Sequence, residues 1–471
     1  MTLLDLTPPK QLASRLQGLP VAIIGGGPIG LATAANLTDR GIDFVLLEAG
    51  DRVGASVEEW GHIRFFSPWR HLVDPVSRRL LAETGWVEPP ADALPTGAEL
   101  VRDFLVPLAE LPAIAARTRL GVTVTDVTRE GMDRTRTKGR AEAPFLLRVQ
   151  TTDGVEELTA RAVVDASGTY RTPNSLGSSG LDPLGLADVA DLVSPAMPDV
   201  LGRERASFAG RHTVVVGAGH SAANTMLNLV QLADEEPGTR ITWVIRNATA
   251  ARVATAPDDE LQARASIGAR VEALVASGRI TLVDRFEIVR LSRGSRDASS
   301  SVGRSSTNGT DASSSVGRSS TNGNDAASAV RITGRRGDGL ETIEADRIVN
   351  ATGFRPNLEM LREIRLELDD IVEAPKRLAP LIDPNVHSCG TVEPHGFAEL
   401  TQPERDFFIV GMKSYGRAPT FLLATGYEQV RSISAWLAGD AAAARNVELV
   451  LPATGVCSTD AAAATGSNCC G

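Results

Sequence analysis

Three glycines and an acidic residue near the start of the chain have the types and spacing of a dinucleotide-binding site. Gly25, Gly27 and Gly30 form a G-x-G-x-x-G pattern, and Glu48 follows about 20 residues later. The first glycine permits a sharp turn, the second lets the backbone approach a pyrophosphate, and the third allows close packing of a helix. An acid at this distance can accept both hydroxyls of an adenosine ribose, which favours FAD or NAD over NADP.

The elements around these residues are those that such a site requires. A short apolar strand precedes the glycines, and a helical pattern begins at Pro28 and Ile29. The N-terminus of this helix would offer free N–H groups and a positive dipole end to the phosphates. A second apolar strand, residues 44–47, ends on Glu48, and Ala49 follows it. We therefore expect all of these residues to contact one cofactor.

A second glycine loop, of the form G-x-G-x-x-A, contains Gly217, Gly219, His220 and Ser221 and follows a run of three valines. The next predicted strand ends on Arg246 instead of an acid. A guanidinium at this place can fork onto a 2′-phosphate and stack on adenine, so the pattern predicts NADPH rather than NADH. The alternative is that Arg246 only ends a strand at the surface. His220 could contact a phosphate or face solvent.

Two further strands end in turns of small residues, which would let backbone amides approach a cofactor. The sequence Asp-Ala-Ser-Gly occupies residues 165–168, and Asn-Ala-Thr-Gly occupies residues 350–353, so Gly168 and Gly353 are candidate contacts. The motifs therefore alternate along the chain as glycine loop, small-residue turn, glycine loop and small-residue turn. This order predicts an α/β fold with two Rossmann-like three-layer dinucleotide-binding domains. It resembles the order in two-dinucleotide flavoproteins, which implies that the NADPH domain is inserted in the FAD domain.

The expected domain limits follow from this order. The FAD domain takes residues 1–200 and 346–440, the NADPH domain takes residues 205–345, and a flexible tail takes residues 441–471. Within the NADPH domain, residues 294–329 contain a serine-rich segment that is repeated almost unchanged. Nothing in that segment can bury a core, so we expect a disordered insertion.

Trp60 lies in an aromatic stretch, residues 60–69, although only 4% of the chain is aromatic. The stretch could form a wall of a flavin pocket, or it could fill the local core. The sequence does not identify a catalytic acid or base.

The cysteines are concentrated at one end of the chain. Cys389 stands alone, whereas Cys457, Cys469 and Cys470 lie in the predicted tail. Adjacent thiols can capture a soft ion or be reduced at a flavin, and three thiolates suit trivalent arsenic, which makes these three a candidate metal site. The alternative is an unstructured tail that is dispensable.

The composition narrows the possible partners. The chain has 471 residues, 42% of them hydrophobic, and a formal net charge of −10, which argues against nucleic acid as a main partner. No apolar run approaches the roughly 18–20 residues that span a bilayer, and the first 20 residues lack a secretory core with a cleavage site. We expect a cytoplasmic protein without a membrane partner. The oligomeric state stays open, with a homodimer among the candidates.

The order of the motifs resembles the two-dinucleotide-binding flavoprotein superfamily over about residues 20–438. Within it, the chain is most similar to class B flavin monooxygenases and N-hydroxylases, and it also resembles monooxygenase-like flavoproteins encoded beside bacterial arsenic-resistance genes. The resemblance implies FAD at the first glycine loop and NADPH at the second. Two features depart from such families. Residues 208–212 do not fit the F-x-G-x-x-x-H signature of class B enzymes, and no C-x-x-C pair of a thioredoxin reductase precedes the tail.

Three functions follow from these patterns. The first is a monooxygenase that uses FAD, NADPH and O₂ on a small soft nucleophile, such as a thiol compound or an arsenical. The second is a reductase that passes electrons through the tail thiols to a metalloid or a disulfide. The third is a metalloid-binding or redox-sensing flavoprotein with little turnover.

Overall fold

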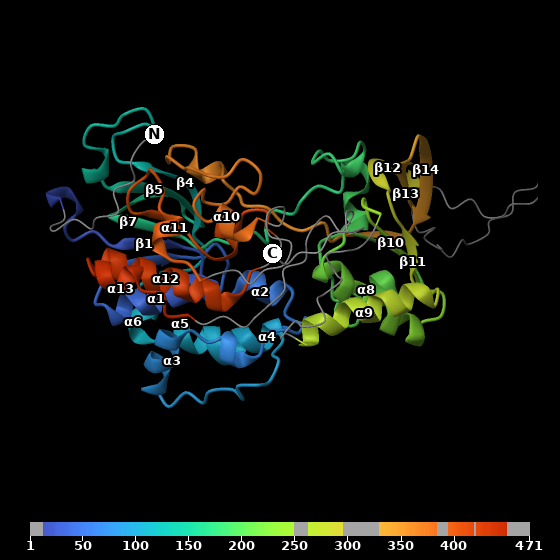
Figure 1. Ribbon diagram of the computed structural model, residues 1–471, viewed down its shortest axis with the longest axis horizontal. Coiled ribbons are helices and arrows are strands. Elements are labelled where there is room, and N and C mark those ends of the chain that lie inside the picture. Colours follow the sequence, from blue (N-terminus) through green and yellow to red (C-terminus); the bar gives the residue numbers. More distant parts are fainter. Residues whose placement is uncertain (1–12, 249–261, 295–328, 384–393, 419–420, 450–471) are drawn as a thin grey trace, which may run out of the picture.

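The computed structural model describes residues 13–248, 262–294, 329–383, 394–418 and 421–449 (Figure 1). The described chain folds into two halves that lie side by side, each built around a five-stranded parallel sheet (Figure 1). No helix in these described ranges is both long and apolar enough to cross a membrane.

The sheet of the first half has the strand order β16-β7-β1-β2-β3. Its strands, in chain order, are β1 (Val21–Ile24), β2 (Phe44–Leu47), β3 (Thr118–Arg119), β7 (Ala162–Asp165) and β16 (Phe407–Ile409). β1 pairs in parallel with β2 on one side and with β7 on the other, so these strands end at the same edge. Because β1 and β7 are buried along their whole length, both faces of the sheet must be covered by other layers.

Helices cover one face of this sheet and a small second sheet covers the other. Val21 and Ile23 of β1 share a buried cluster with the helices α1 (Pro28–Asp39) and α12 (Leu423–Leu437), and Ala22 and Ile24 point to the opposite side. The opposite cluster includes the antiparallel strands β4 (Thr123–Arg129), β5 (Phe145–Thr151) and β6 (Gly154–Ala160). The alternation along β1 thus produces three layers.

A buried charge cluster fixes the small sheet to the main one. Glu404, just before β16, accepts hydrogen bonds from Arg129 Nε at 2.8 Å and from Arg140 Nε at 2.9 Å. All three side chains are buried. Burial alone would raise the pKa of Glu404, but the hydrogen bonds and charges of the two arginines lower it below its ordinary value.

The second half repeats this plan with different strands. The sheet order is β11-β10-β9-β15-β8, and all neighbours are parallel. Its strands are β8 (Val193–Ser194), β9 (His212–Val216), β10 (Arg240–Val244), β11 (Thr281–Val283) and β15 (Arg347–Asn350). The helices α8 (His220–Glu235) and α9 (Gln262–Ala276) pack on one face, and the antiparallel strands β12 (Glu287–Gly294), β13 (Ala329–Arg336) and β14 (Gly339–Ala345) pack on the other (Figure 1).

The remaining elements are short. They are η1 (Ser14–Leu16), α2 (Ala55–Glu59), η2 (Trp69–His71), α3 (Pro75–Ala82), α4 (Gly97–Leu100), the π-helical segment η3 (Val101–Leu105), α5 (Val106–Ala109), α6 (Pro112–Ala115), η4 (Arg140–Glu142), η5 (Leu186–Leu192), α7 (Arg205–Phe208), η6 (Glu359–Leu361), α10 (Ala379–Ile382), α11 (Phe397–Leu400), η7 (Gly411–Tyr415) and α13 (Ala441–Arg445).

The chain crosses between the two halves twice, and the two crossings lie against each other. Asn174 N–H donates to Gly353 O at 2.9 Å, and Arg355 N–H donates to Thr172 O at 3.0 Å. The chain therefore leaves the first sheet after β7 and returns after β15, which is the inserted arrangement expected from the order of the motifs. The predicted fold class is confirmed.

The serine-rich repeat and the expected tail differ in how much of each segment the structure describes. The repeat at 294–329 lies outside the described residues except for its ends, where Gly294 pairs with Ala329 in the β12–β13 hairpin. The tail expected from residue 441 begins instead with α13, where Ala444 is buried and its carbonyl accepts a hydrogen bond from Ser432 Oγ at 2.6 Å. The domain limits themselves stay a prediction.

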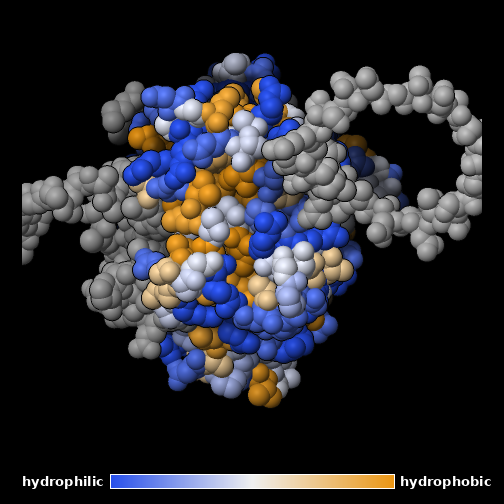
Figure 2. Space-filling view, turned by 90° about the vertical axis from the view of Figure 1, so that its right-hand side faces the viewer, coloured by the Kyte–Doolittle hydropathy of each residue, from blue (hydrophilic) through white to orange (hydrophobic). Residues whose placement is uncertain are grey.

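Figure 2 shows the end of the molecule that lies on the right of Figure 1 and belongs to the second half. A band of apolar residues runs across this face between strongly hydrophilic regions (Figure 2). The large apolar side chains exposed in the second half and its entry segment include Leu181, Leu184 and Leu340.

Candidate dinucleotide sites

The first and third glycines of the first loop are required by close backbone contacts. Gly25 has a φ of +102°, and a Cβ there would lie 2.7 Å from Ala166 O in the turn after β7. A Cβ on Gly30 would lie 1.8 Å from Gly25 O. No side chain fits in either place, so these glycines bring helix, loop and return turn together.

The second glycine differs, because it leaves open space. A Cβ on Gly27 would meet no atom within 4 Å. Gly27 is the N-cap of α1, Pro28 follows at the first helical position, and no side chain hydrogen-bonds to this helix end. The first turn of α1 therefore presents its N–H groups to an open space of the kind that a pyrophosphate occupies.

Glu48 lies beside this space and is held by the backbone. Its Oε2 accepts a hydrogen bond from Gly26 N–H and its Oε1 accepts one from Gly50 N–H, both at 2.6 Å. Each carboxylate oxygen keeps a further lone pair for a ribose hydroxyl. The neighbouring Ala49 is exposed. Glu48 thus lies beside the open space with acceptor capacity left for a ribose, and its contact with a cofactor stays a prediction.

Ile29 connects the glycine loop to the C-terminal part of the first half. A Cβ on Gly411, which begins η7, would lie 3.0 Å from the Ile29 side chain, and one on Gly426 in α12 would lie 2.5 Å from it. Small residues at both places let η7 and α12 pack closely on the start of α1. Trp60 packs elsewhere, against Phe65 with ring centroids 5.3 Å apart. This contact agrees with local core packing, and a contact of Trp60 with a cofactor stays a prediction.

Sequence reasoning missed a buried ion pair beneath this site. Lys413 Nζ in η7 lies 2.6 Å from Asp165 Oδ2 at the end of β7 and 3.1 Å from Ser167 Oγ. Both charged side chains are completely buried. The sequence did contain a signal for the lysine of this pair. Lys413 is one of only four lysines in the chain and follows a run of apolar residues and glycine.

The second glycine loop has the same backbone geometry as the first. Gly217 has a φ of +130°, and a Cβ there would lie 2.1 Å from Ala351 O in the turn after β15. Gly219 is the N-cap of α8 with no side-chain cap, and a Cβ there would meet nothing within 4 Å. The two return-turn glycines, Gly168 and Gly353, both have positive φ, +68° and +99°. The structure therefore contains two open helix N-termini of one type.

His220 and Ser221 occupy the first turn of α8. The His220 ring is half-buried and packs on Phe66 of the first half, with ring centroids 5.9 Å apart. His220 is thus not freely exposed, and it joins the aromatic stretch at 60–69 to the second glycine loop. Ser221 is also half-buried, and its carbonyl accepts a hydrogen bond from Thr225 within the helix.

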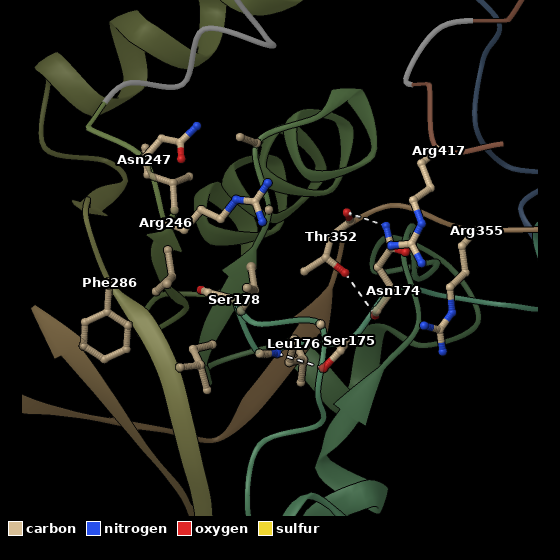
Figure 3. Close-up of a pocket in the computed structure, with 18 residues that line it drawn as sticks. Asn174, Ser175, Leu176, Ser178, Arg246, Asn247, Phe286, Thr352, Arg355 and Arg417 are labelled. Carbon is tan, nitrogen blue, oxygen red and sulfur yellow. Dashed lines mark hydrogen bonds between the residues drawn. The ribbon is translucent and has the colours of Figure 1, made fainter. Parts of the chain in front are cut away.

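A pocket of about 250 Å³ opens beside the second loop (Figure 3). Gly217, Arg246 and Thr352 line it, together with Arg355 and Arg417. Arg246 follows β10, is exposed, and extends its guanidinium toward the pocket (Figure 3). The sequence predicted Arg246 but gave no reason to select Arg355 or Arg417, because their approach depends on how the two halves meet.

Two titratable side chains lie near the junction of the halves. Burial raises the pKa of Tyr170 to about 12, and its ring packs on Phe354 at 5.3 Å. Burial also lowers the pKa of His62. Near pH 7, Tyr170 is therefore a protonated phenol and His62 a neutral imidazole. With His220, they are titratable groups of the described residues that lie where the two halves meet.

The predicted metal site lies outside the described residues. Cys457, Cys469 and Cys470 all belong to the segment from 450 onward. Within the described ranges, no group of three or more His, Cys, Asp or Glu side chains is arranged to hold a metal ion.

Comparison with known proteins agrees with this geometry. A family model described as pyridine nucleotide-disulphide oxidoreductase matches residues 22–74, which contain the first glycine loop and Glu48. A comparison with curated protein sequences found no significant match.

Solved structures share the fold at low sequence identity. Bacillithiol disulfide reductase Bdr from Bacillus cereus superposes with a TM-score of 0.58 at 19% identity, covering 90% of this chain and 97% of its own. DfoA, a cadaverine monooxygenase from Erwinia amylovora solved with FAD, gives 0.56 at 12% identity, covering 96% and 99%. A flavin monooxygenase mutant from Stenotrophomonas maltophilia gives 0.52 at 22% identity, covering 89% and 99%.

These similarities show a fold that monooxygenases and disulfide reductases have in common. They do not separate the two activities for this chain. None of the three proteins concerns arsenic, so the link to arsenic resistance stays a prediction.

Proposed function

We propose that this protein is an FAD- and NADPH-dependent oxidoreductase of the flavin monooxygenase type. The observation that carries the proposal is the pair of open glycine loops, one beside Glu48 and the other beside Arg246. An acid that accepts ribose hydroxyls suits FAD, and a guanidinium that faces a 2′-phosphate suits NADPH.

The cofactors bound at the two glycine loops would supply the redox chemistry. When bound, FAD would supply hydride acceptance and O₂ activation: NADPH and a proton would provide the reducing equivalents, one oxygen atom would go to a soft nucleophile and the other would leave as water. The chain's own residues bind and orient. The α1 and α8 N-termini receive the phosphates, Glu48 receives the ribose, and η7 with α12 closes the first site around Ile29.

The cysteine positions favour an oxygenase over a dithiol reductase. The first cysteine of the chain is Cys389, so no thiol lies on the strands, loops or helix N-termini of the two glycine sites. A reductase of this fold would have to bring Cys389 or the thiols Cys457, Cys469 and Cys470 to the flavin, and all four lie outside the described residues. The substrate class that we propose is a small soft nucleophile, such as a thiol compound or an arsenical.

One experiment separates these activities. The full-length protein and a triple variant with Cys457, Cys469 and Cys470 changed to Ser are compared for NADPH oxidation in air with thiols, amines and arsenite. We expect substrate-stimulated O₂ consumption that the triple variant retains. NADPH-dependent reduction of a disulfide or metalloid without O₂, abolished in the triple variant, would establish the reductase instead.

A further inference from the structure

The pocket beside the second glycine loop has arginines at opposite ends. Arg246 extends toward it from the end of β10, and Arg355 and Arg417 lie on the other side of Thr352 (Figure 3). The loop with Gly217 lies between the two ends. One elongated ligand with several negative charges could therefore contact both ends.

The three arginines differ in how their charge is used. The guanidinium of Arg417 forms an ion pair with Glu373, with nitrogen–oxygen distances of 2.7 and 3.3 Å. Neither Arg246 nor Arg355 has an acidic partner among the described residues, although Arg355 is half-buried. A partly buried guanidinium is costly to leave without an anion. Arg355 is thus the cation of this pocket that most needs a ligand.

The backbone holds Arg355 in place. Its N–H donates to Thr172 O at 3.0 Å, and the preceding Phe354 packs on Tyr170. Arg355 therefore lies on the paired crossings between the halves. A phosphate bound by Arg355 would therefore lie beside the paired crossings.

The ligand that fits this charge pattern is NADPH itself, so the inference rests on the proposed function. NADPH carries a 2′-phosphate on the adenosine and two phosphates in its bridge. Arg246 faces the 2′-phosphate and the α8 N-terminus takes the bridge. We propose that Arg355 binds the nicotinamide-side phosphate of NADPH, so that two arginines divide recognition of the cofactor.

The test compares two probes on the FAD-loaded full-length protein. NADP⁺ contains all three phosphates, whereas 2′,5′-ADP lacks the nicotinamide-side phosphate. Calorimetric titration gives the Kd of each probe for the wild type and for R246Q, R355Q and R417Q. Flavin absorbance and Tm verify that each variant is folded and loaded.

The proposal predicts a distinct pattern. R246Q weakens both probes by about 10- to 100-fold, as expected for one charge-assisted contact. R355Q weakens NADP⁺ by about 10-fold and changes 2′,5′-ADP by less than about 2-fold. R417Q, whose charge is already paired, changes neither probe by more than about 2-fold. If R355Q does not fold, R355K serves, with a smaller loss of NADP⁺ affinity because its ammonium lacks the fork.

Three outcomes would overturn the proposal. Equal weakening of both probes by R355Q would place its contact on the adenosine side. Unchanged NADP⁺ affinity would remove the phosphate contact, and an accompanying rise in the KM of an oxygen-accepting substrate would make Arg355 a substrate ligand. A wild-type protein that binds no NADP⁺ would refute the proposed function itself, which is a different failure.

Discussion

The two return turns of the molecule have the same backbone but different charges. After β7, Ser167 donates from its N–H and its hydroxyl to Asp165 Oδ1, at 3.1 and 2.6 Å. After β15, Thr352 donates from its N–H and its hydroxyl to Asn350 Oδ1, at 3.3 and 2.7 Å. The turn therefore needs a single oxygen acceptor at the strand end, and a neutral amide supplies it as well as a carboxylate does.

The second polar atom of the Asp165 side chain and that of the Asn350 side chain have different partners. Asp165 Oδ2 binds Lys413 of η7, whereas Asn350 Nδ2 donates to Asn174 O at 3.0 Å in the adjacent crossing. The first turn is thus tied to η7, which packs on Ile29 beside the first glycine loop, and the second turn is tied to the connection between the halves. Because a buried ion pair adds little stability over an apolar pair of the same size, we expect that this pair acts by fixing the position of η7.

The largest expected effect comes from breaking the ion pair on one side. K413M leaves the Asp165 carboxylate buried without a cation, which should cost about 3–5 kcal/mol of unfolding free energy. The measurement is urea unfolding of the protein with and without FAD. The matched control is the double variant D165N/K413M, which copies the neutral turn of Asn350 and should recover most of the loss.

A second comparison uses a buried carboxyl that forms no ion pair with any described residue. Asp74, the N-cap of α3, accepts from Ser77 N–H at 2.7 Å, and burial raises its pKa to about 6. Because the folded protein holds this proton more tightly than the unfolded chain, stability should fall by about 2–3 kcal/mol as pH rises from about 4 to about 6. D74N keeps an acceptor without the charge and should flatten this slope. An unchanged slope in the variant would exclude Asp74 as its source.

The smallest expected effects are on binding and separate the two loops. G27A and G219A each add a methyl group to open space, so both variants should fold normally. G27A should lower the affinity for FAD by about 10-fold without changing the NADP⁺ affinity of the protein that still contains FAD. G219A should lower the affinity for NADP⁺ by about 10-fold without changing the affinity for FAD. Flavin content and NADP⁺ titration measure the two. If either variant weakened both cofactors equally, the loops would not be separate sites.

The sequence predicted the parts of the molecule that depend on local pattern. Gly25 and Gly217, the acid at Glu48 and the small-residue turns each follow an apolar strand within a few residues, so their elements could be recognised from neighbouring positions. The alternation of these motifs then implied the inserted arrangement that the structure has.

Contacts between distant positions could not be predicted in this way. Asp165 and Lys413 are 248 positions apart, and nothing in the sequence around either residue indicates that the two form an ion pair. The pairing of β8 with β15 likewise joins segments that only the folded chain brings together. The sequence does not single out Arg355, because its role as a ligand depends on which arginines of the pocket are already paired with an acidic side chain. In the structure, Glu373 pairs with Arg417.

The assignment of one dinucleotide to each loop is tested most directly by anaerobic reduction of the bound flavin. Stopped-flow absorbance follows the wild type and R246Q with NADPH and with NADH. We predict that the wild type is reduced at much lower concentrations of NADPH than of NADH, and that R246Q lowers this preference by about 10- to 100-fold. A protein that holds no flavin, or a preference that R246Q leaves unchanged, would contradict the account.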